Sequence, residues 1–197
     1  MGKPTEERRQ EIIEATLELA GERGVKKVTT QAIADKVKIA QPTVFRHFKS
    51  RDAIFSAAIG FIAERLFQVL EGDFAGKAPP DQRLQQLIRR QLAFIGSARG
   101  LPRLLFSDRL HLESPQLKRT VRTVMERYIA RIEALLQEGM ESGCFRSDLA
   151  PDVVASWIAA LVQGLVMRWS IYDFDFPLED KADEVWAFIE PALKDNR

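Results

Sequence analysis

The 197-residue chain has little of what marks secreted, metal-binding or membrane proteins. Its one cysteine, Cys144, excludes an intramolecular disulfide framework and a cysteine-rich metal site. The charged start, "MGKPTEERRQE", lacks the apolar core of a signal peptide, and the longest apolar run, 153–167, is shorter than the ~20 residues of a membrane span. We therefore expect a reduced, soluble, cytoplasmic protein with no membrane contact, no cofactor and no metal.

Alternating, β-branched segments, which are typical of strands, are also missing. Apolar residues instead recur at intervals of three and four, in blocks separated by Gly, Pro and Asp. Because 46% of the residues are hydrophobic, the chain can bury a sizeable core. We predict an all-α protein with helices over residues 6–23, 30–37, 41–47, from 51 to a Gly/Pro-rich break at 72–81, 81–97, 103–112, from "ESPQ" to 143, 152–172 and 181–194.

Charge is distributed unevenly along the chain. The formal net charge is +1, but residues 23–51 hold eight bases and one acid, whereas residues from 171 onward hold eight acids and three bases. A basic window of this kind favours a polyanionic partner, although a basic run is more often only a solvated face. Two short predicted helices, 30–37 and 41–47, lie inside the window and are joined by the turn "KIA". Together they form a helix-turn-helix, which places its second helix in the major groove of DNA.

The predicted 41–47 helix has one apolar face. Val44 and Phe48 fall on it, which leaves the other sides free to contact DNA. Gln41 is the best base reader, because its amide can pair bidentately with adenine, and Pro42 and Thr43 offer apolar surface to a thymine methyl group. Arg46 can reach guanine or phosphate, and we rank phosphate first. Further phosphate contacts are expected from Thr29, Thr30, Gln31, His47, Lys49 and Arg51.

Residues 11–58 resemble the TetR-type transcriptional repressors. The likeness rests on the apolar first helix that ends in Gly24, the run "TVFRHF" and the helix start "SRDAIF". Three residues depart from the usual pattern. Lys38 stands where a turn glycine is common and costs about 1 kcal/mol if its φ is positive. Ala40 replaces an N-cap serine at a comparable cost, and Phe45 replaces a tyrosine that would reach a phosphate.

The resemblance implies two domains and a twofold dimer. Residues 1–50 would be the DNA-binding helix-turn-helix domain, and 51–197 the ligand-binding and dimerisation domain. The 152–172 helix is apolar nearly all round, so it needs a cover on two sides. We expect its own core on one side and a second copy on the other, through Ala159, Ala160, Val162, Gly164 and Val166. Such a dimer would read a pseudo-palindromic operator, with recognition helices ~34 Å apart. A monomer with a buried core helix is the minor alternative.

The resemblance also implies a cavity whose small-molecule occupant releases the protein from DNA. The candidate lining residues are mostly apolar or aromatic, which favours an apolar or aromatic effector. At least half of the aromatic ones are expected to belong to the hydrophobic core and not to line a cavity. The candidate lining residues are Phe61, Arg65, Phe94, Arg103, Phe106, His111, Met125, Tyr128 and Trp157.

Two other functions stay open. The first is a DNA-binding protein of the same fold without an effector. The second, an enzyme, is disfavoured because the sequence has no P-loop or dinucleotide fingerprint, and no nucleophile signature surrounds Cys144. A di-metal bundle needs two Glu-x-x-His pairs, whereas this chain has two histidines and one of them is His47. A mononuclear metal site at Asp108 and His111, in "DRLH", stays open but improbable. We predict a non-enzymatic transcriptional regulator, with repression as the family tendency.

Overall fold

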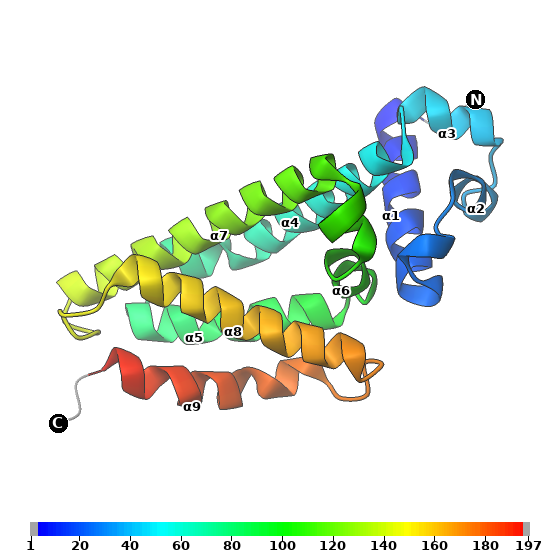
Figure 1. The fold of residues 1–197 in the computed structure, drawn as a ribbon. Coiled ribbons are helices and arrows are strands. Elements are labelled where there is room, and N and C mark those ends of the chain that lie inside the picture. Colours follow the sequence, from blue (N-terminus) through cyan, green and yellow to red (C-terminus); the bar gives the residue numbers. More distant parts are fainter. Residues whose placement is uncertain (1–3, 195–197) are drawn as a thin grey trace. The chain divides into compact units, whose positions relative to one another are not determined.

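The computed structural model describes residues 4–194, and every regular element in that range is helical (Figure 1). The all-α prediction is therefore confirmed for the described part of the chain. The elements are α1 (Thr5–Arg23), η1 (Val25–Lys27), α2 (Thr30–Lys36), α3 (Gln41–His47), α4 (Arg51–Ala75), α5 (Pro80–Gly96), α6 (Gly100–Leu105), η2 (Arg109–Glu113), α7 (Pro115–Glu141), α8 (Pro151–Ile171), η3 (Leu178–Lys181) and α9 (Ala182–Leu193).

Two element boundaries differ from the sequence-based expectation. Helix α4 continues to Ala75, into the segment predicted as a break. The single element expected over 103–112 is instead the helix α6 and the π-helical turn η2. Pro102 lies in the first turn of α6, where its missing N–H costs no hydrogen bond, so this proline does not prevent an earlier helix start.

The chain forms two compact units. Unit 1 comprises the residues up to Glu64 together with Ala98–Thr123, and unit 2 comprises Arg65–Ser97 together with the residues from Val124 onward. Two of the boundaries fall inside α4 and α7, and the third falls between α5 and α6. The predicted division at residue 50 separates a DNA-binding domain from a ligand-binding domain. Because it concerns function and the two units are defined by contacts, it stays a prediction.

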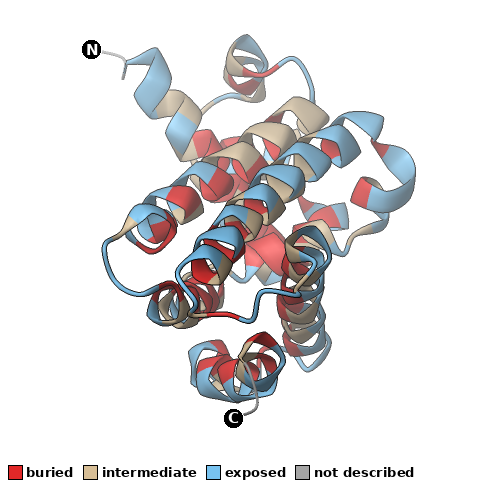
Figure 2. Cartoon of the chain, turned by 90° about the vertical axis from the view of Figure 1, so that its left-hand side faces the viewer, coloured by how far each residue is buried: buried red, intermediate tan, exposed pale blue. Residues whose placement is uncertain are grey.

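Unit 1 is built around the inner faces of its first helices. Ile12 of α1, Ile33 of α2, Val44 of α3 and Phe55 of α4 are fully buried, and Figure 2 shows buried positions concentrated on one side of each helix. Such one-sided burial is what an apolar period of 3.6 residues produces.

Helices α1 and α6 approach each other closely through their backbones at Gly100. A Cβ atom on Gly100 would lie 2.1 Å from the carbonyl oxygen of Leu17, and one on Gly21 would lie 3.1 Å from the amide nitrogen of Gly100. Only glycine fits at Gly100 without displacing the backbone of α1. The crossing therefore fixes α6 firmly against the first helix.

Unit 2 is a helical bundle in which α5 packs against α8, α9 and η3. The inward face of α5 is fully buried through Leu84, Leu87, Ile88 and Leu92. The turn after α8 is held by Trp169, whose Nε1 donates to the carbonyl of Phe176 at 2.8 Å and whose ring meets Phe174 edge-on at 4.6 Å. These contacts position α9 along α5.

Local hydrogen bonds complete the ends of several helices. Gly24 has a φ of 77° and donates its N–H to Ala20. The hydroxyl of Thr29 accepts from the amide of Ala32 at 3.0 Å, and that of Ser50 accepts from Ala53 at 3.1 Å. Ala40 makes no side-chain cap, as expected.

Lys38 has a φ of 56°, so the condition under which this residue lowers stability is met. In this conformation a non-glycine residue lowers the stability of the folded state by roughly 1–2 kcal/mol. Glycine removes this strain but loses more backbone entropy on folding, and that loss is the smaller of the two. We expect Lys38→Gly to raise the free energy of unfolding by about 0.5–1 kcal/mol in urea titrations. Lys27 does not have a positive φ, so Lys27→Gly should lower the free energy of unfolding. Equal losses for both variants would contradict this explanation.

Two described helices, α4 and α8, are long and apolar enough to cross a membrane by length and composition alone. Core helices of soluble proteins pass the same test. Leu70 of α4 and Ala155 of α8 are fully buried by other protein groups, as in such core helices.

Candidate nucleic-acid interface

Helix α3 presents a polar and aromatic face to solvent. Val44 is fully buried and Phe48 is 4% exposed, so the prediction that these two residues form its packed face is confirmed. Phe45 is 48% exposed on another side of the same helix, and Pro42 and Arg46 are exposed too. The exposed side of α3 therefore carries the residues expected to touch DNA.

The first residues of α2 and α3 are joined by a side-chain hydrogen bond. Nε2 of Gln41 donates to Oγ1 of Thr30 at 2.8 Å. A second amide, that of Gln31, donates to Asp35 one turn further along α2, at 2.7 Å. Both amides expected at the DNA surface are thus oriented by neighbouring groups.

An arginine that sequence reasoning missed holds the other end of α3. Nη1 of Arg9, on α1, donates to the carbonyl oxygen of His47 at 2.5 Å, and its guanidinium lies 4.2 Å from the ring centre of Phe48. A cation at a helix C-terminus stabilises the unpaired carbonyl groups there. No local motif reveals this contact, because Arg9 and His47 are 38 residues apart.

Acidic residues from outside the basic window neutralise part of it. Nζ of Lys36 lies 2.9 Å from Glu18 and 3.0 Å from Glu22, and these carboxylates raise the pKa of Lys36. Lys26 lies 3.5 Å from Asp108. Arg23 lies 3.9 Å from Glu22. The bases of the window with no ion pair to any residue between 4 and 194 are Lys27, Lys38, Arg46, Lys49 and Arg51.

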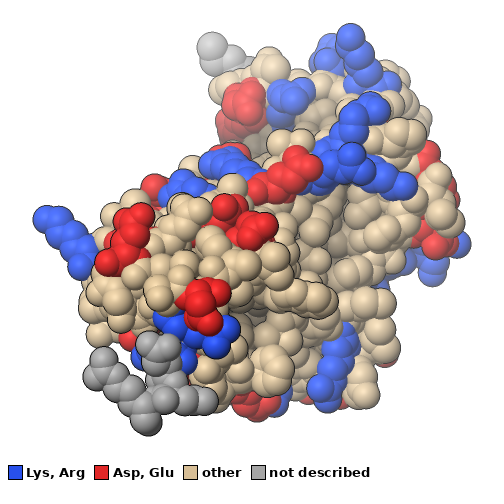
Figure 3. Space-filling model, turned by 60° about the vertical axis from the view of Figure 1, so that its left-hand side comes forward, with Lys and Arg blue, Asp and Glu red and all other residues tan. Residues whose placement is uncertain are grey.

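The charge available to DNA is therefore smaller than the sequence count suggests. Elsewhere on the molecule basic and acidic side chains are likewise interspersed, as Figure 3 shows for the face that it presents. Arg51, expected to bind phosphate, is partly buried, with its guanidinium 5.6 Å from the ring centre of Phe55. The guanidinium of Arg109 is 5.9 Å from the same ring, and Arg109 pairs with Asp52.

The surroundings of His47 favour its neutral form. Its Nδ1 is buried without a hydrogen-bond partner. Burial lowers the pKa of His47, and the neighbouring Arg46, Arg9 and Arg8 lower it further. The neutral imidazole can give a phosphate an N–H hydrogen bond, but not the positive charge that releases counterions.

The lowered pKa of His47 predicts that unit 1 loses stability in mild acid. The unfolded chain takes up the proton first as the pH falls, near its ordinary pKa of about 6.5. This group therefore has no effect above about pH 7.5, and it destabilises the native state progressively as the pH falls toward the folded-state pKa. We expect His47→Gln to flatten the decline in unfolding free energy between pH 7 and pH 5 in urea titrations. An unaltered slope for His47→Gln would refute the assignment.

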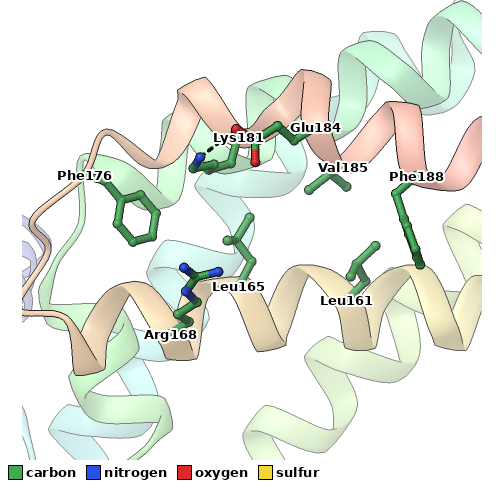
Figure 4. A pocket seen from close by; sticks show the side chains of 8 residues that line it. All are labelled: Leu161, Leu165, Arg168, Phe176, Lys181, Glu184, Val185 and Phe188. Carbon is green, nitrogen blue, oxygen red and sulfur yellow. Dashed lines mark hydrogen bonds and ion pairs between the residues drawn. The ribbon is translucent and has the colours of Figure 1, made fainter.

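Unit 2 carries an apolar groove between α8 and α9. Its volume is about 530 Å³, and Trp157 and Phe188 stand along it with 71% and 75% of their surfaces exposed. An adjoining hollow of about 310 Å³ shares Leu161 and Phe188 with the groove, and Figure 4 shows it between α8 and α9. Arg168 and Lys181 make the far end of this hollow polar, and Lys181 pairs with Glu184 at 2.6 Å.

The five residues predicted for the dimer surface do not all face solvent. Ala160 and Gly164 are exposed. Ala159, Val162 and Val166 are only 2%, 2% and 4% exposed, so their side chains belong to the core of their own protomer and are not available to a second copy. Trp157, expected in an interior cavity, lies instead on the exposed groove.

Comparison with known proteins accounts for both parts of the chain. Residues 12–58 match the family model of the bacterial regulatory proteins of the tetR family, and residues 77–171 match the tetracyclin repressor-like C-terminal domain. The chain belongs to the TetR family. It is a DNA-binding transcriptional regulator with a helix-turn-helix domain and a helical C-terminal domain, and the fold is typically homodimeric.

Full-length relatives of this TetR-family chain include the nucleoid occlusion factor SlmA. The protein of Vibrio cholerae is 27% identical over 190 residues, which is 95% of this chain and 96% of that protein. The one from Aliivibrio fischeri strain MJ11 is 26% identical over the same shares.

Solved structures with the same fold include several transcriptional regulators. The fatty acid degradation regulator FadR from Bacillus halodurans has a TM-score of 0.85 at 18% identity and covers 98% of each chain. FadR from Bacillus subtilis, in complex with stearoyl-CoA, has a TM-score of 0.80 at 19% identity and covers 93% of this chain and 98% of that one. A regulator from Saccharomonospora viridis, in complex with choline, has a TM-score of 0.84 at 23% identity and covers 97% and 100%.

The residues predicted to line an effector cavity are divided between the two units. Phe61, Arg103, Phe106 and His111 belong to unit 1, with Phe106 and His111 exposed, whereas Arg65, Phe94, Met125 and Tyr128 belong to unit 2. The hydroxyl of Tyr128 donates to Oε1 of Gln91 at 2.5 Å inside unit 2, and burial raises the pKa of Tyr128. Gln91, which sequence reasoning missed, thus supplies a buried polar partner.

The residues considered for a metal have other partners in this TetR-family fold. Asp108 pairs with Lys26, and Nε2 of His111 lies 3.0 Å from the carbonyl oxygen of Leu105. Within residues 4–194, no group of three His, Cys, Asp or Glu residues is placed to hold a metal ion.

Proposed function

We propose that this TetR-family regulator represses transcription by binding a pseudo-palindromic operator as a homodimer. The observation that carries the proposal is the exposed face of α3. There, Gln41 is oriented by Thr30 beside exposed Pro42, Phe45 and Arg46, while Val44 and Phe48 anchor the helix. An oriented amide at the start of a recognition helix suits the hydrogen-bond pattern of adenine in the major groove.

The dimer surface that we propose is the α8/α9 groove. Trp157 and Phe188 expose large apolar areas there, and such patches mark association sites. Gly164 lies inside α8, and a Cβ atom added to it would meet no atom within 4 Å beyond the backbone of its own helix, so packing within the protomer does not require glycine. Close approach of a second helix would explain a residue that costs a helix about 1 kcal/mol relative to alanine.

A small-molecule effector is a further part of the proposal. Proteins of this fold with stearoyl-CoA and with choline support ligand binding in general, and the aromatic residues of unit 2 suit an apolar or aromatic effector. Release from DNA would follow from a higher affinity of the effector for the conformation that does not bind DNA. We further propose that the protein acts in the cytoplasm and has no enzymatic activity.

A gel-shift titration on promoter DNA flanking the gene tests the proposal. We expect binding whose logarithm falls linearly with the logarithm of salt concentration, with a slope of about −0.9 per neutralised phosphate. Gln41→Ala should reduce the preference for the operator more than it reduces binding to random duplex. Equal losses on both duplexes would contradict the base-reading role, and binding without salt dependence would contradict the interface itself.

A second candidate is a DNA-binding role in nucleoid occlusion without an effector. The full-length similarity to SlmA proteins supports it. Chromatin immunoprecipitation distinguishes the two roles, because a repressor should occupy one or a few promoters, whereas a nucleoid-associated role should give sites across much of the chromosome. Thermal shifts against a metabolite library provide the second arm, since only the first role requires an effector.

A further inference from the structure

We propose that Thr30 is a specificity-determining positioning residue, whose hydroxyl orients the Gln41 amide so that it reads adenine. The inference deepens the proposed function and rests on it. Its starting point is the 2.8 Å hydrogen bond from Nε2 of Gln41 to Oγ1 of Thr30.

This hydrogen bond connects two helices and not two turns of one helix. Thr30 is the first residue of α2, and Gln41 is the first residue of α3. The capping role at the start of α2 belongs to Thr29, whose hydroxyl accepts from the amide of Ala32. The Thr30 hydroxyl is therefore not needed to begin the helix and is available for Gln41.

The hydroxyl of Thr30 can serve two partners at once. A threonine hydroxyl has one proton to donate and two lone pairs that accept. The Gln41 N–H uses one lone pair, and the proton is left for a DNA phosphate oxygen, the commonest partner of polar groups at such interfaces. Once the proton is donated to phosphate, the Thr30 oxygen can only accept. The amino end of the Gln41 amide must then face Thr30.

This orientation fixes what Gln41 offers to a base. The amide retains Oε1 as an acceptor and a second N–H as a donor, which match the N6 amino group and N7 of adenine. Guanine presents two acceptors, O6 and N7, on the same edge, so Oε1 would face an acceptor there. An untethered amide can rotate and donate to guanine instead. The Thr30 hydroxyl therefore excludes guanine by preventing that rotation.

The hydrogen bond of Gln31 differs from that of Gln41 in which helix supplies the acceptor. Gln31 donates to Asp35 on its own helix, four residues away, so its orientation depends on α2 alone. Gln41 depends on a group from a different helix, and the packing of α2 against α3 therefore controls base reading directly.

Three variants of the full-length protein test the inference. Thr30→Val keeps the shape and β-branching but removes the hydroxyl, Thr30→Ser keeps the hydroxyl, and Thr120→Val makes the same chemical change on α7. The probe is the duplex that the wild-type protein selects from a random-sequence pool, together with every single-base variant of that duplex. Affinities are measured by fluorescence anisotropy at fixed salt, and melting temperatures check the fold.

We expect Thr30→Val to lose discrimination between adenine and guanine by about tenfold at one position of each half-site, at an unchanged melting temperature. Thr30→Ser should restore most of that discrimination, and Thr120→Val should match the wild type. Thr30→Val should cause no further loss of discrimination in a Gln41→Ala background, because there the amide is already absent.

Three results would overturn the inference. Thr30→Val could retain wild-type discrimination, or it could weaken all duplexes equally, in which case Thr30 would be a phosphate contact only. Thr30→Val could also lower discrimination by the same factor with and without Gln41, in which case the effect would not act through the amide. If the wild-type protein selects no sequence from the pool, the proposed function fails first and the inference fails with it.

Discussion

Trp157→Asp is expected to convert the protein to monomers and to remove high-affinity operator binding. Trp157 is 71% exposed in its own protomer, so the substitution leaves the protomer core intact. In a twofold interface the change occurs twice, and each carboxylate would be buried in an apolar groove without a partner. At about 2–5 kcal/mol for each unpaired charge, the dimer dissociation constant should rise by at least about a thousandfold.

Sedimentation velocity over a range of protein concentrations measures the mass, and gel shifts on the operator measure the consequence. The matched control is Leu112→Asp, which makes a comparable change at an apolar residue that is 82% exposed on η2, outside the groove. Leu112→Asp should stay dimeric. Trp157→Asp with an unchanged mass would place the dimer surface elsewhere, and a monomeric wild-type protein would remove it altogether.

Local sequence signals predicted the helix-turn-helix well because short-range physics determines it. The C′ glycine at Gly24 and the missing side-chain cap at Ala40 each depend on a few neighbouring residues. The burial of Val44 and Phe48 follows from a spacing of four residues in a helix. Expectations of this kind need no knowledge of distant parts of the chain.

Long-range contacts could not be predicted in this way. Glu18 and Glu22 lie outside the basic window, yet they neutralise Lys36, which is why a charge count along the sequence overestimated the free positive charge. The contact of Arg9 with the end of α3 has the same character. Both depend on how α1 packs against the helix-turn-helix, and no local pattern records that packing.

Which side of α8 faces solvent was ambiguous in the sequence for a different reason. A helix that is apolar nearly all round has no polar face to indicate which side points outward. The need for two covers was therefore predictable, whereas the choice between Ala159, which is buried, and Ala160, which is exposed, was not. Exposure in the folded protomer resolves this choice. Trp157, Ala160 and Gly164 are exposed and are therefore available to a second copy.

Gly100→Ala is expected to destabilise unit 1 by about 2–3 kcal/mol, because overpacking at a rigid contact forces backbone shifts. The added Cβ would lie 2.1 Å from the Leu17 carbonyl oxygen and 2.9 Å from its carbonyl carbon, both of which are backbone atoms. Neither can rotate away as a side chain would, so α6 must move off α1. Urea unfolding followed by circular dichroism measures the loss, and operator binding should weaken because α1 also carries Arg9 at the end of α3.

A graded glycine series makes this prediction specific to the crossing. Gly21→Ala, with its nearest atom at 3.1 Å, should cost less than Gly100→Ala. Gly60→Ala, inside α4 with nothing within 4 Å, should stabilise the protein by about 0.5–1 kcal/mol, since alanine is the better helix former. If Gly100→Ala behaved like Gly60→Ala, α6 would be free to move away from α1. The crossing would then not be a rigid support for the DNA-reading helix, and the weakened operator binding should be absent as well.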